Sequence, residues 1–573
     1  MIAGPKAPVP KSPTVHAALV AAEGSRNGLI FVDLQERETK LTWPEIHQRA
    51  RKAAAHLRAH GVSAGDRVAI ILPTSPEFAD SFFGILLAGA VPVPLYPPVR
   101  LGRLEEYYTA TVRMIAVCGA VAVVSDARVR KLLGQVIERA APRLGLIAAE
   151  DLSSGTEEFS APAVGSDLGL IQFSSGSTVD PKAVALTHDN LMSQCASLYT
   201  HLIPNAGAEA TGVCWLPLYH DMGLIGCLLS ALYYPGNLVL ISPEIFLAKP
   251  ALWLRAISRH KAIISPAPDF AYALCAKRVK DVDLVGVDLS AWLAALNGAE
   301  PISPQSLRAF TERFRPYGLR DDALRPVYGL SEASLAVTAS SPPFKAREGT
   351  ICVGAPVPGF EVKICDARGE RKDGEIGRIF TRGPSVMRGY FGDDAATRKA
   401  IREGWLDTGD LGFIAEGELY VTGRDKDIII IRGANHGPQQ FEACLLDVAG
   451  VRTGCAVALG LYEESGEAVL VLAERAAGAG AERDADTIAA ITHAILSGTG
   501  IKPGLVRMLT AGTLPRTSSG KLRRSEALRR YRAGSLSAPT RVALMPLVAA
   551  MLRSQLAMAR ARVRRLWQHD ATV

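Results

Sequence analysis

Apolar and polar residues alternate along the first half of the chain with the rhythm of an α/β protein. Residues 43–60 repeat apolar side chains at helical spacing before Gly61, which predicts an amphipathic helix. Residues 66–72 are a short apolar run with β-branched side chains, which predicts a buried strand, and a helix over 77–90 and a strand over 91–95 follow. Strand and helix signals at this spacing predict parallel βαβ units. The same rhythm returns in strands predicted over 262–265 and 292–297.

The pattern changes in the last third of the chain. Residues 374–382 and 417–422 alternate in glycine-rich surroundings, which predicts short strands of a β-rich subdomain. A charged link at 423–427 separates them from a compact α+β segment, and we place a domain boundary there. In that segment the sequence predicts a strand, a helix and two further strands, at 428–431, 439–447, 456–459 and 469–472.

The composition is that of a folded globular protein. Hydrophobic residues make up 48% and charged residues 21% of 573, which excludes a disordered chain and a collagen-like chain. The net charge of +7 is modest and does not indicate a nucleic-acid-binding protein. Nine scattered cysteines predict buried thiols in a reducing compartment. The N-terminus lacks a secretory signal, and the most apolar run, 82–96, is shorter than a membrane span, so we expect a soluble, cytoplasmic protein.

A loop rich in small and hydroxylated residues is the most informative chemical feature. Residues 174–182 read SSGSTVDPK, after an apolar strand at 168–173 and before a helix that starts near Asp189. Small residues let the backbone approach phosphate oxygens, hydroxyl and N–H groups donate to them, and Lys182 adds a charge. The simpler interpretation is a polar surface loop, and the spacing is not that of a Walker A loop.

Three further segments support nucleotide binding. Residues 328–332 (YGLSE) place an aromatic face, a glycine and a carboxylate close together, and residues 405–410 (WLDTGD) place an acid in a turn, where it can accept from both hydroxyls of a ribose. Residues 516–521 (RTSSGK) offer a lysine on a flexible loop. Each segment alone also fits a structural role, as a core tyrosine, a turn aspartate or a solvated lysine.

Together and in this order, these motifs resemble the adenylate-forming superfamily of acyl-CoA synthetases, luciferases and peptide-synthetase adenylation domains. Within it the chain looks most like the fatty acyl-AMP ligases, on PLYPP at 94–98, LPLYHDMGLIG at 216–226, NGAEP at 297–301 and RGANHGP at 432–438. The resemblance implies activation of a fatty acid by MgATP to an acyl-adenylate. The acyl group would then pass to the phosphopantetheine thiol of an acyl carrier protein, or of a polyketide or peptide synthase carrier domain.

The resemblance also implies a role for each matching residue. The phosphates of ATP would be held by Ser174, Ser175, Gly176, Ser177, Thr178 and Lys182. The rest of the ATP/AMP site would be Asn297, Gly298, Ala299, Glu300, Tyr328, Gly329, Ser331, Asp410 and Arg424, the last two at the ribose. Mg²⁺ would be held by Glu332 and Thr178. Lys521 would bridge the acyl carboxylate and the α-phosphate, and His220 would stand at the mouth of the acyl tunnel.

The pattern and the resemblance together predict the architecture. We expect a large α/β adenylation domain over 1–424, built of two βαβ-type subdomains and a small β-barrel-like subdomain. A small mobile α+β domain over 425–534 would carry Lys521, with the hinge at Asp425 and Lys426.

Three departures from the family pattern leave alternatives open. Val179 and Ala183 stand where the family has glycines, which supports a catalytically weak adenylate- or acyl-binding module as one alternative. The segment between Leu335 and Val353 is short, where fatty acyl-AMP ligases carry an insertion thought to disfavour coenzyme A. A fatty acyl-CoA ligase is therefore the second alternative. Gly437 replaces a large aromatic residue, and nothing in the sequence explains that change.

The tail over 535–573 lies beyond the resemblance and is basic. One helical face would contain Leu544, Val548, Leu552, Leu556, Ala559, Val563 and Leu566, with Arg553, Arg560 and Arg564 off that face. The simpler interpretation is a helix packed on the protein's own body. The other is a basic amphipathic helix that meets a membrane surface, an acidic carrier protein or a partner synthase.

Overall fold

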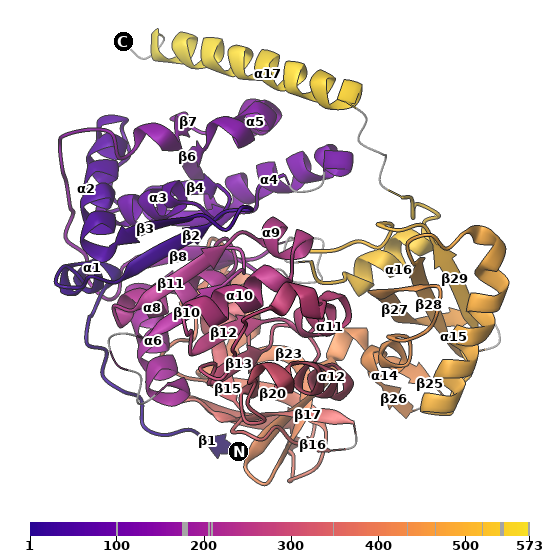
Figure 1. Cartoon of the computed structure of the whole chain (residues 1–573). Coiled ribbons are helices and arrows are strands. Elements are labelled where there is room, and N and C mark those ends of the chain that lie inside the picture. The colour runs from indigo at the N-terminus through magenta and orange to yellow at the C-terminus, as the bar shows by residue number, and fades with distance from the viewer. Residues whose placement is uncertain are drawn as a thin grey trace.

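The chain folds into two parallel sheets with helices on their faces, an antiparallel β-rich part and a smaller α+β part (Figure 1). The structure is a computed structural model, and it describes residues 1–98, 101–174, 181–203, 207, 210–347, 349–431, 434–463, 466–517, 520–538 and 544–570. Within these ranges, none of the helices combines the length and the apolar character needed to cross a membrane.

The first sheet is parallel, as the alternation predicts. Its strands, in spatial order, are β5 (Val91–Leu95), β4 (Arg67–Ile71), β6 (Ala120–Ser125) and β7 (Gly145–Ala148). The helices that alternate with these strands along the chain are α3 (Pro76–Leu87), α4 (Leu104–Cys118) and α5 (Ala127–Ala140), and α2 (Trp43–Ala59) precedes them. A capping box between Thr42 and Glu45 starts α2, which then buries its apolar face against α3. The structure confirms the predicted α2, β4 and β5 to within one residue at each end.

The second sheet places the ends of its strands where the site forms. Its strands, in spatial order, are β3 (Glu38–Thr42), β2 (Gly28–Val32), β11 (Asn237–Ile241), β10 (Thr211–Cys214), β12 (Ile264–Ala267), β13 (Ala294–Asn297) and β14 (Leu324–Gly329), parallel from β2 onward. The carboxyl ends of parallel strands meet at one edge, which brings Asn297 and Gly329 together. The predicted strands at 262–265 and 292–297 begin two residues too early, because Ala262 and Trp292 are apolar and buried but precede the strands.

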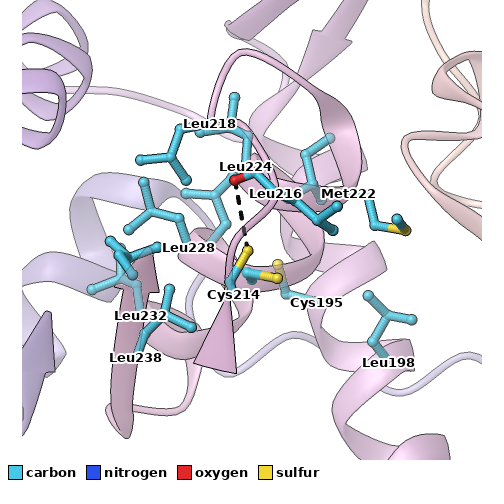
Figure 2. Packing of buried hydrophobic residues seen from close by; sticks show 14 of the residues in the cluster. Cys195, Leu198, Cys214, Leu216, Leu218, Met222, Leu224, Leu228, Leu232 and Leu238 are labelled. Atoms are coloured by element: carbon cyan, nitrogen blue, oxygen red, sulfur yellow. Dashed lines mark hydrogen bonds between the residues drawn. The ribbon is translucent and has the colours of Figure 1, made fainter. Parts of the chain in front are cut away.

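A hairpin presents the phosphate-loop sequence. β8 (Leu168–Phe173) pairs antiparallel with β9 (Ala183–Thr187), with Phe173 opposite Ala183. The strand β8 was predicted, whereas β9 was not. After β9 comes α6 (His188–Leu202), which contributes Cys195 and Leu198 to the apolar core shown in Figure 2.

The glycine-rich stretch forms the β-rich part. Its antiparallel strands, in spatial order, are β17 (Thr350–Pro356), β24 (Glu418–Arg424), β23 (Trp405–Ala415), β20 (Gly377–Arg382) and β18 (Glu361–Asp366). Pairing of β23 with β24 sets Asp410 opposite Arg424. The two strands predicted here correspond to β20 and β24.

Beyond the charged link the chain builds a core of its own. The elements are β25 (Ile429–Ile431), β26 (Ala434–His436), α14 (Pro438–Ala443), β27 (Val451–Glu463), β28 (Gly466–Arg475), α15 (Asp484–Thr499), β29 (Leu505–Leu509) and α16 (Arg524–Arg532). Two hydrophobic clusters consist only of residues from this part of the chain. The predicted helix at 439–447 is shorter in the structure. The predicted strands at 456–459 and 469–472 are the apolar centres of β27 and β28, whose more polar ends the pattern missed.

The tail forms one helix, α17 (Leu544–Asp570), which packs along α5 (Figure 1). The residues buried against the body are small, namely Ala550, Ser554, Ala557 and Ala561. The predicted apolar face is therefore not the packing face: Val548, Leu552, Leu556 and Val563 are exposed. Leu544 and Leu566 lie outside the residues whose side chains are described.

Candidate active site

One cavity of about 460 Å³ collects most of the described residues that the sequence singled out. It reaches from the base of the phosphate loop, past the end of β14 and the β23–β24 pair, to the loop before α16. The residues of the predicted site that line it are Ser174, Lys182, His220, Ala299, Tyr328, Gly329, Ser331, Glu332, Asp410, Arg424, Asp425, Lys426 and Lys521. The far end is largely apolar and includes Leu198, Met222 and Leu238.

Asp410 is one of the buried acids that line this cavity. The Tyr328 hydroxyl donates to one carboxylate oxygen of Asp410 at 2.8 Å, and Arg424 Nε lies 3.2 Å from the other. Burial raises the pKa of Asp410, while the charge of Arg424 and the hydrogen bond from Tyr328 lower it. The three residues thus form one hydrogen-bonded cluster at the cavity wall.

Lys521 enters the same cavity from the small C-terminal part. The turn before it is closed by two backbone N–H bonds, from Thr517 to the Lys521 carbonyl at 2.8 Å and from Gly520 to the Thr517 carbonyl at 3.1 Å. Burial lowers the pKa of Lys521, and the negative charges of Asp221 and Glu300 oppose that effect. The ammonium therefore lies among carboxylates contributed by the large N-terminal part.

His220 belongs to a second cluster, which includes an acid that we gave no role. Its Nδ1 lies 2.5 Å from one carboxylate oxygen of Asp221, and the Ser331 hydroxyl donates to the other. Burial alone would raise the pKa of Asp221. The neighbouring His220 and Lys521 outweigh burial and hold that pKa below its usual range. Asp221 therefore orients both His220 and Ser331.

Glu332 and Lys182 each contact Tyr390. The Tyr390 hydroxyl donates to the Glu332 carboxylate at 3.0 Å, and the Lys182 ammonium lies 4.3 Å from the centre of the Tyr390 ring. Burial raises the pKa of Glu332. At the base of the loop, the Ser174 N–H donates to the Lys182 carbonyl at 3.0 Å. Ser175, Gly176, Ser177, Thr178 and Val179 lie outside the described residues.

The segment 297–300 meets the cavity through Ala299. Asn297 is fully buried and donates to Asp269 at 2.9 Å, and Glu300 accepts from the Phe270 N–H at 2.8 Å. Ala299 has a φ of 72°, which turns the chain toward the cavity. Gly298 fits closely, because a Cβ there would lie 2.7 Å from a Val327 methyl group.

The charged link lines the cavity as well. Asp425 accepts from Arg378 at 3.0 Å, and Arg378 also donates to Asp407 at 2.7 Å. Burial and the charge of Arg424 lower the pKa of Lys426. The link is thus held to the β-rich part by ion pairs.

The sequence analysis missed the partners of the site residues. Tyr390, Asp221 and Arg378 contact Glu332, His220 and Asp425, and of these partners Tyr390 and Arg378 come from distant segments. Asp221 was visible in LPLYHDMGLIG, directly after His220. No local signal marks Tyr390 or Arg378, because their roles follow from the pairing of β21 (Gly389–Tyr390) with β9 and of β20 with β23.

The residues present fit MgATP. Among the described residues, no group of three or more His, Cys, Asp and Glu side chains could hold a metal ion. A Mg²⁺ ion bound mainly through substrate phosphates needs only one or two protein carboxylates. Glu332 provides one, on the same cavity wall as Lys182.

The sequence and the fold match known adenylating enzymes. The model of the AMP-binding enzyme family matches residues 19–391. The long-chain-fatty-acid–AMP ligase FadD26 of Mycobacterium marinum is 34% identical, over 86% of this chain and 91% of that protein. The medium-chain-fatty-acid–[acyl-carrier-protein] ligase JamA of Moorena producens is 30% identical, over 90% of this chain and 94% of that protein.

A solved structure from work on the fatty acyl-adenylate ligases of E. coli and L. pneumophila has a TM-score of 0.85 and 31% identity, and the match covers 92% of this chain and 99% of that one. The chain belongs to the AMP-binding enzyme family, the class of adenylate-forming ligases. Within that class it is similar to the fatty acyl-AMP ligases, which confirms the resemblance and the fold class inferred from the sequence.

Proposed function

We propose that the protein joins a fatty acid to AMP and then transfers the acyl group to the phosphopantetheine thiol of an acyl carrier protein. In the first step a carboxylate oxygen attacks the α-phosphorus of ATP, and the bond to the β-phosphate breaks to release pyrophosphate. In the second step the thiolate attacks the acyl carbon and AMP leaves. The observation that carries this proposal is that Lys521 shares one cavity with Asp410, Tyr328 and His220.

The geometry supports a division of roles. Asp410 and Arg424 would bind the ribose, and Lys182 the phosphates, with Ser175 to Thr178 completing the loop. The adenine would lie by Ala299, Tyr328 and Gly329. The Lys521 ammonium would hold the acyl carboxylate and the α-phosphate in line and stabilise the charge that develops between them. When bound, Mg²⁺ neutralises phosphate charge, and Glu332 would hold it. The apolar end, with Leu198, Met222 and Leu238, would take the acyl chain.

Residues 425–534 would act as a small mobile domain. Its hydrophobic clusters are separate from those of the large domain, and the link at Asp425 and Lys426 runs past the cavity. Because Lys521 fills the region next to His220, a thiol needs Lys521 to withdraw before it can reach the acyl carbon. A hinge at Asp425–Lys426 would allow that movement.

The direct experiment supplies a panel of fatty acids and MgATP and measures acyl-AMP, followed by addition of a carrier protein or coenzyme A. We expect acyl-AMP with at least one fatty acid and loading of the carrier. If no acid gives acyl-AMP, the proposal fails. Formation of acyl-CoA without carrier loading would favour the second candidate, a fatty acyl-CoA ligase. That candidate rests on the short connection between β15 (Ala336–Ala339) and β17.

A further inference from the structure

The inner face of α17 packs closely on α5. Ser554 is buried, and its hydroxyl accepts from the Gly134 N–H of α5 at 2.8 Å. A Cβ on Gly134 would lie 1.8 Å from the Ser554 carbonyl oxygen, so only glycine allows this approach. Ala557 and Ala561 continue the small-residue stripe. The inner face is therefore already occupied.

The outer face of α17 carries large apolar side chains that the body does not cover. Val548 is 45% exposed, Leu552 56%, Leu556 64% and Val563 53%. Their spacing of four, four and seven residues keeps them in one stripe along the helix. A continuous stripe of exposed aliphatic side chains on a folded protein indicates an interaction surface.

The charged residues of α17 are all basic up to its last residue, Asp570. The helix contains five arginines and no acidic residue before Asp570. Arg553, Arg560 and Arg564 lie beside the apolar stripe, between it and the packed face, at the spacing of one helical flank. Arg560 also pairs with Glu138 at 2.8 Å, and Arg553 lies near Glu105 and lowers its pKa, after the larger effect of Arg139. Arg564 is exposed.

We propose that the outer face of α17 docks the protein on an anionic lipid surface. An apolar stripe flanked by arginines is the pattern of a helix that lies in the interfacial plane of a bilayer, with aliphatic side chains among the acyl chains and guanidinium groups at the lipid phosphates. The stripe offers no polar group that needs a protein partner. A second copy of the chain is a poor occupant, because pairing two α17 helices would bring like charges together. The inference does not depend on the reaction proposed above.

The test uses the full-length protein and vesicles of phosphatidylcholine, either alone or with about one third phosphatidylglycerol. We expect sedimentation with the anionic vesicles, weakened by salt. Changing Val548, Leu552, Leu556 and Val563 together to serine should weaken binding at least about tenfold. Arg564→Gln should weaken it about fivefold.

A matched control changes two other exposed valines, Val282→Ser and Val285→Ser, which are 75% and 83% exposed in the structure. That double variant should bind vesicles normally, and all variants should keep adenylation of a water-soluble acid. A Leu556→Trp variant should shift its fluorescence to the blue on anionic vesicles. The proposal is overturned if the wild-type protein binds neither kind of vesicle. It is overturned as well if the serine variant binds the anionic vesicles as strongly as the wild-type protein does. It is also overturned if the serine changes abolish only carrier-protein binding or only self-association.

Discussion

At the scale of single residues, the charged groups of the cavity are controlled by burial and by neighbouring charges from other segments. Lys521, Asp410 and His220 stand in motifs that can be read along the chain. Burial shifts the pKa values of Lys521 and Asp410, and the charges of Asp221 and Arg424 oppose those shifts through tertiary contacts. Short-range patterns identify side chains of a given chemistry, whereas the electrostatic environment of each one comes from tertiary contacts.

Lys521→Ala should reduce acyl-AMP formation by at least about a thousandfold, because in the proposed reaction the ammonium stabilises charge in the transition state. Binding of ATP, measured by calorimetry, should change little, since Asp410, Arg424 and Lys182 remain. Lys502→Ala, an exposed lysine in the same part of the chain, is the control and should be fully active. Retained turnover in Lys521→Ala would remove this residue from its role.

Asp269 gives a stability prediction with a definite pH dependence. Burial, followed by the charge of Glu300, raises the pKa of Asp269 to about 7 from a reference value of 3.8. The folded state therefore holds this proton more tightly than the unfolded state. Its contribution to stability is fully present below pH 3.8 and is lost as pH rises to about 7.

Asp269→Asn keeps an acceptor for Asn297 and removes the buried charge. At pH 8 it should raise the free energy of unfolding by about 2–4 kcal/mol, measured by urea denaturation, and the gain should shrink toward pH 4. Asp288→Asn, an exposed aspartate, is the control. An equal gain at both pH values would contradict the assignment.

At the scale of elements, helices and strands were predicted correctly where one face is buried, because apolar residues then recur at the spacing of that element. The predictions failed where burial does not produce such a spacing. The amphipathic α2 and the strands β4, β5 and β8 follow from apolar spacing alone. In α17 the large apolar residues do not mark the face that packs on the body. The helix docks through Ala550, Ser554, Ala557 and Ala561, and small residues carry a weak hydrophobic signal although they allow the closest approach.

Because α17 docks on α5, we expect Gly134→Ala to destabilise the full chain and to stabilise a chain that lacks residues 540–573. In the full chain, Gly134→Ala should lower the free energy of unfolding by about 1–3 kcal/mol, because its Cβ meets the Ser554 backbone. In a chain lacking residues 540–573, the same change should stabilise α5 by about 0.5–1 kcal/mol, since alanine favours helix over glycine. Urea denaturation of all four proteins measures both effects, and effects of the same sign would show that α17 does not dock on Gly134.

At the scale of the whole molecule, the small C-terminal part contacts the large N-terminal part through polar groups near its edges. Arg530 of α16 forms a two-fold hydrogen bond with Glu106 of α4, at 3.2 and 2.9 Å. Arg103 donates to the Thr513 and Ser537 carbonyls, and Lys277 to the Thr453 hydroxyl. Contacts of this kind form and break at a low free-energy cost, which is compatible with the proposed movement of the small part between the half-reactions. The sequence predicted a hinge, but not these contacts.

Glu106→Gln therefore tests whether the arrangement with Lys521 in the cavity is the one that makes acyl-AMP. An exposed ion pair contributes about 0.2–1 kcal/mol, so its loss should slow adenylation by at most about fivefold. Transfer of the acyl group to the thiol should not slow, because in the proposed reaction Lys521 withdraws from the cavity before that step. Single-turnover measurements of pyrophosphate release and of thioester formation separate the two steps, with Glu157→Gln, another exposed glutamate, as the control. If the variant slows transfer and leaves adenylation unchanged, the Arg530–Glu106 pair belongs to the thiol-transfer arrangement instead.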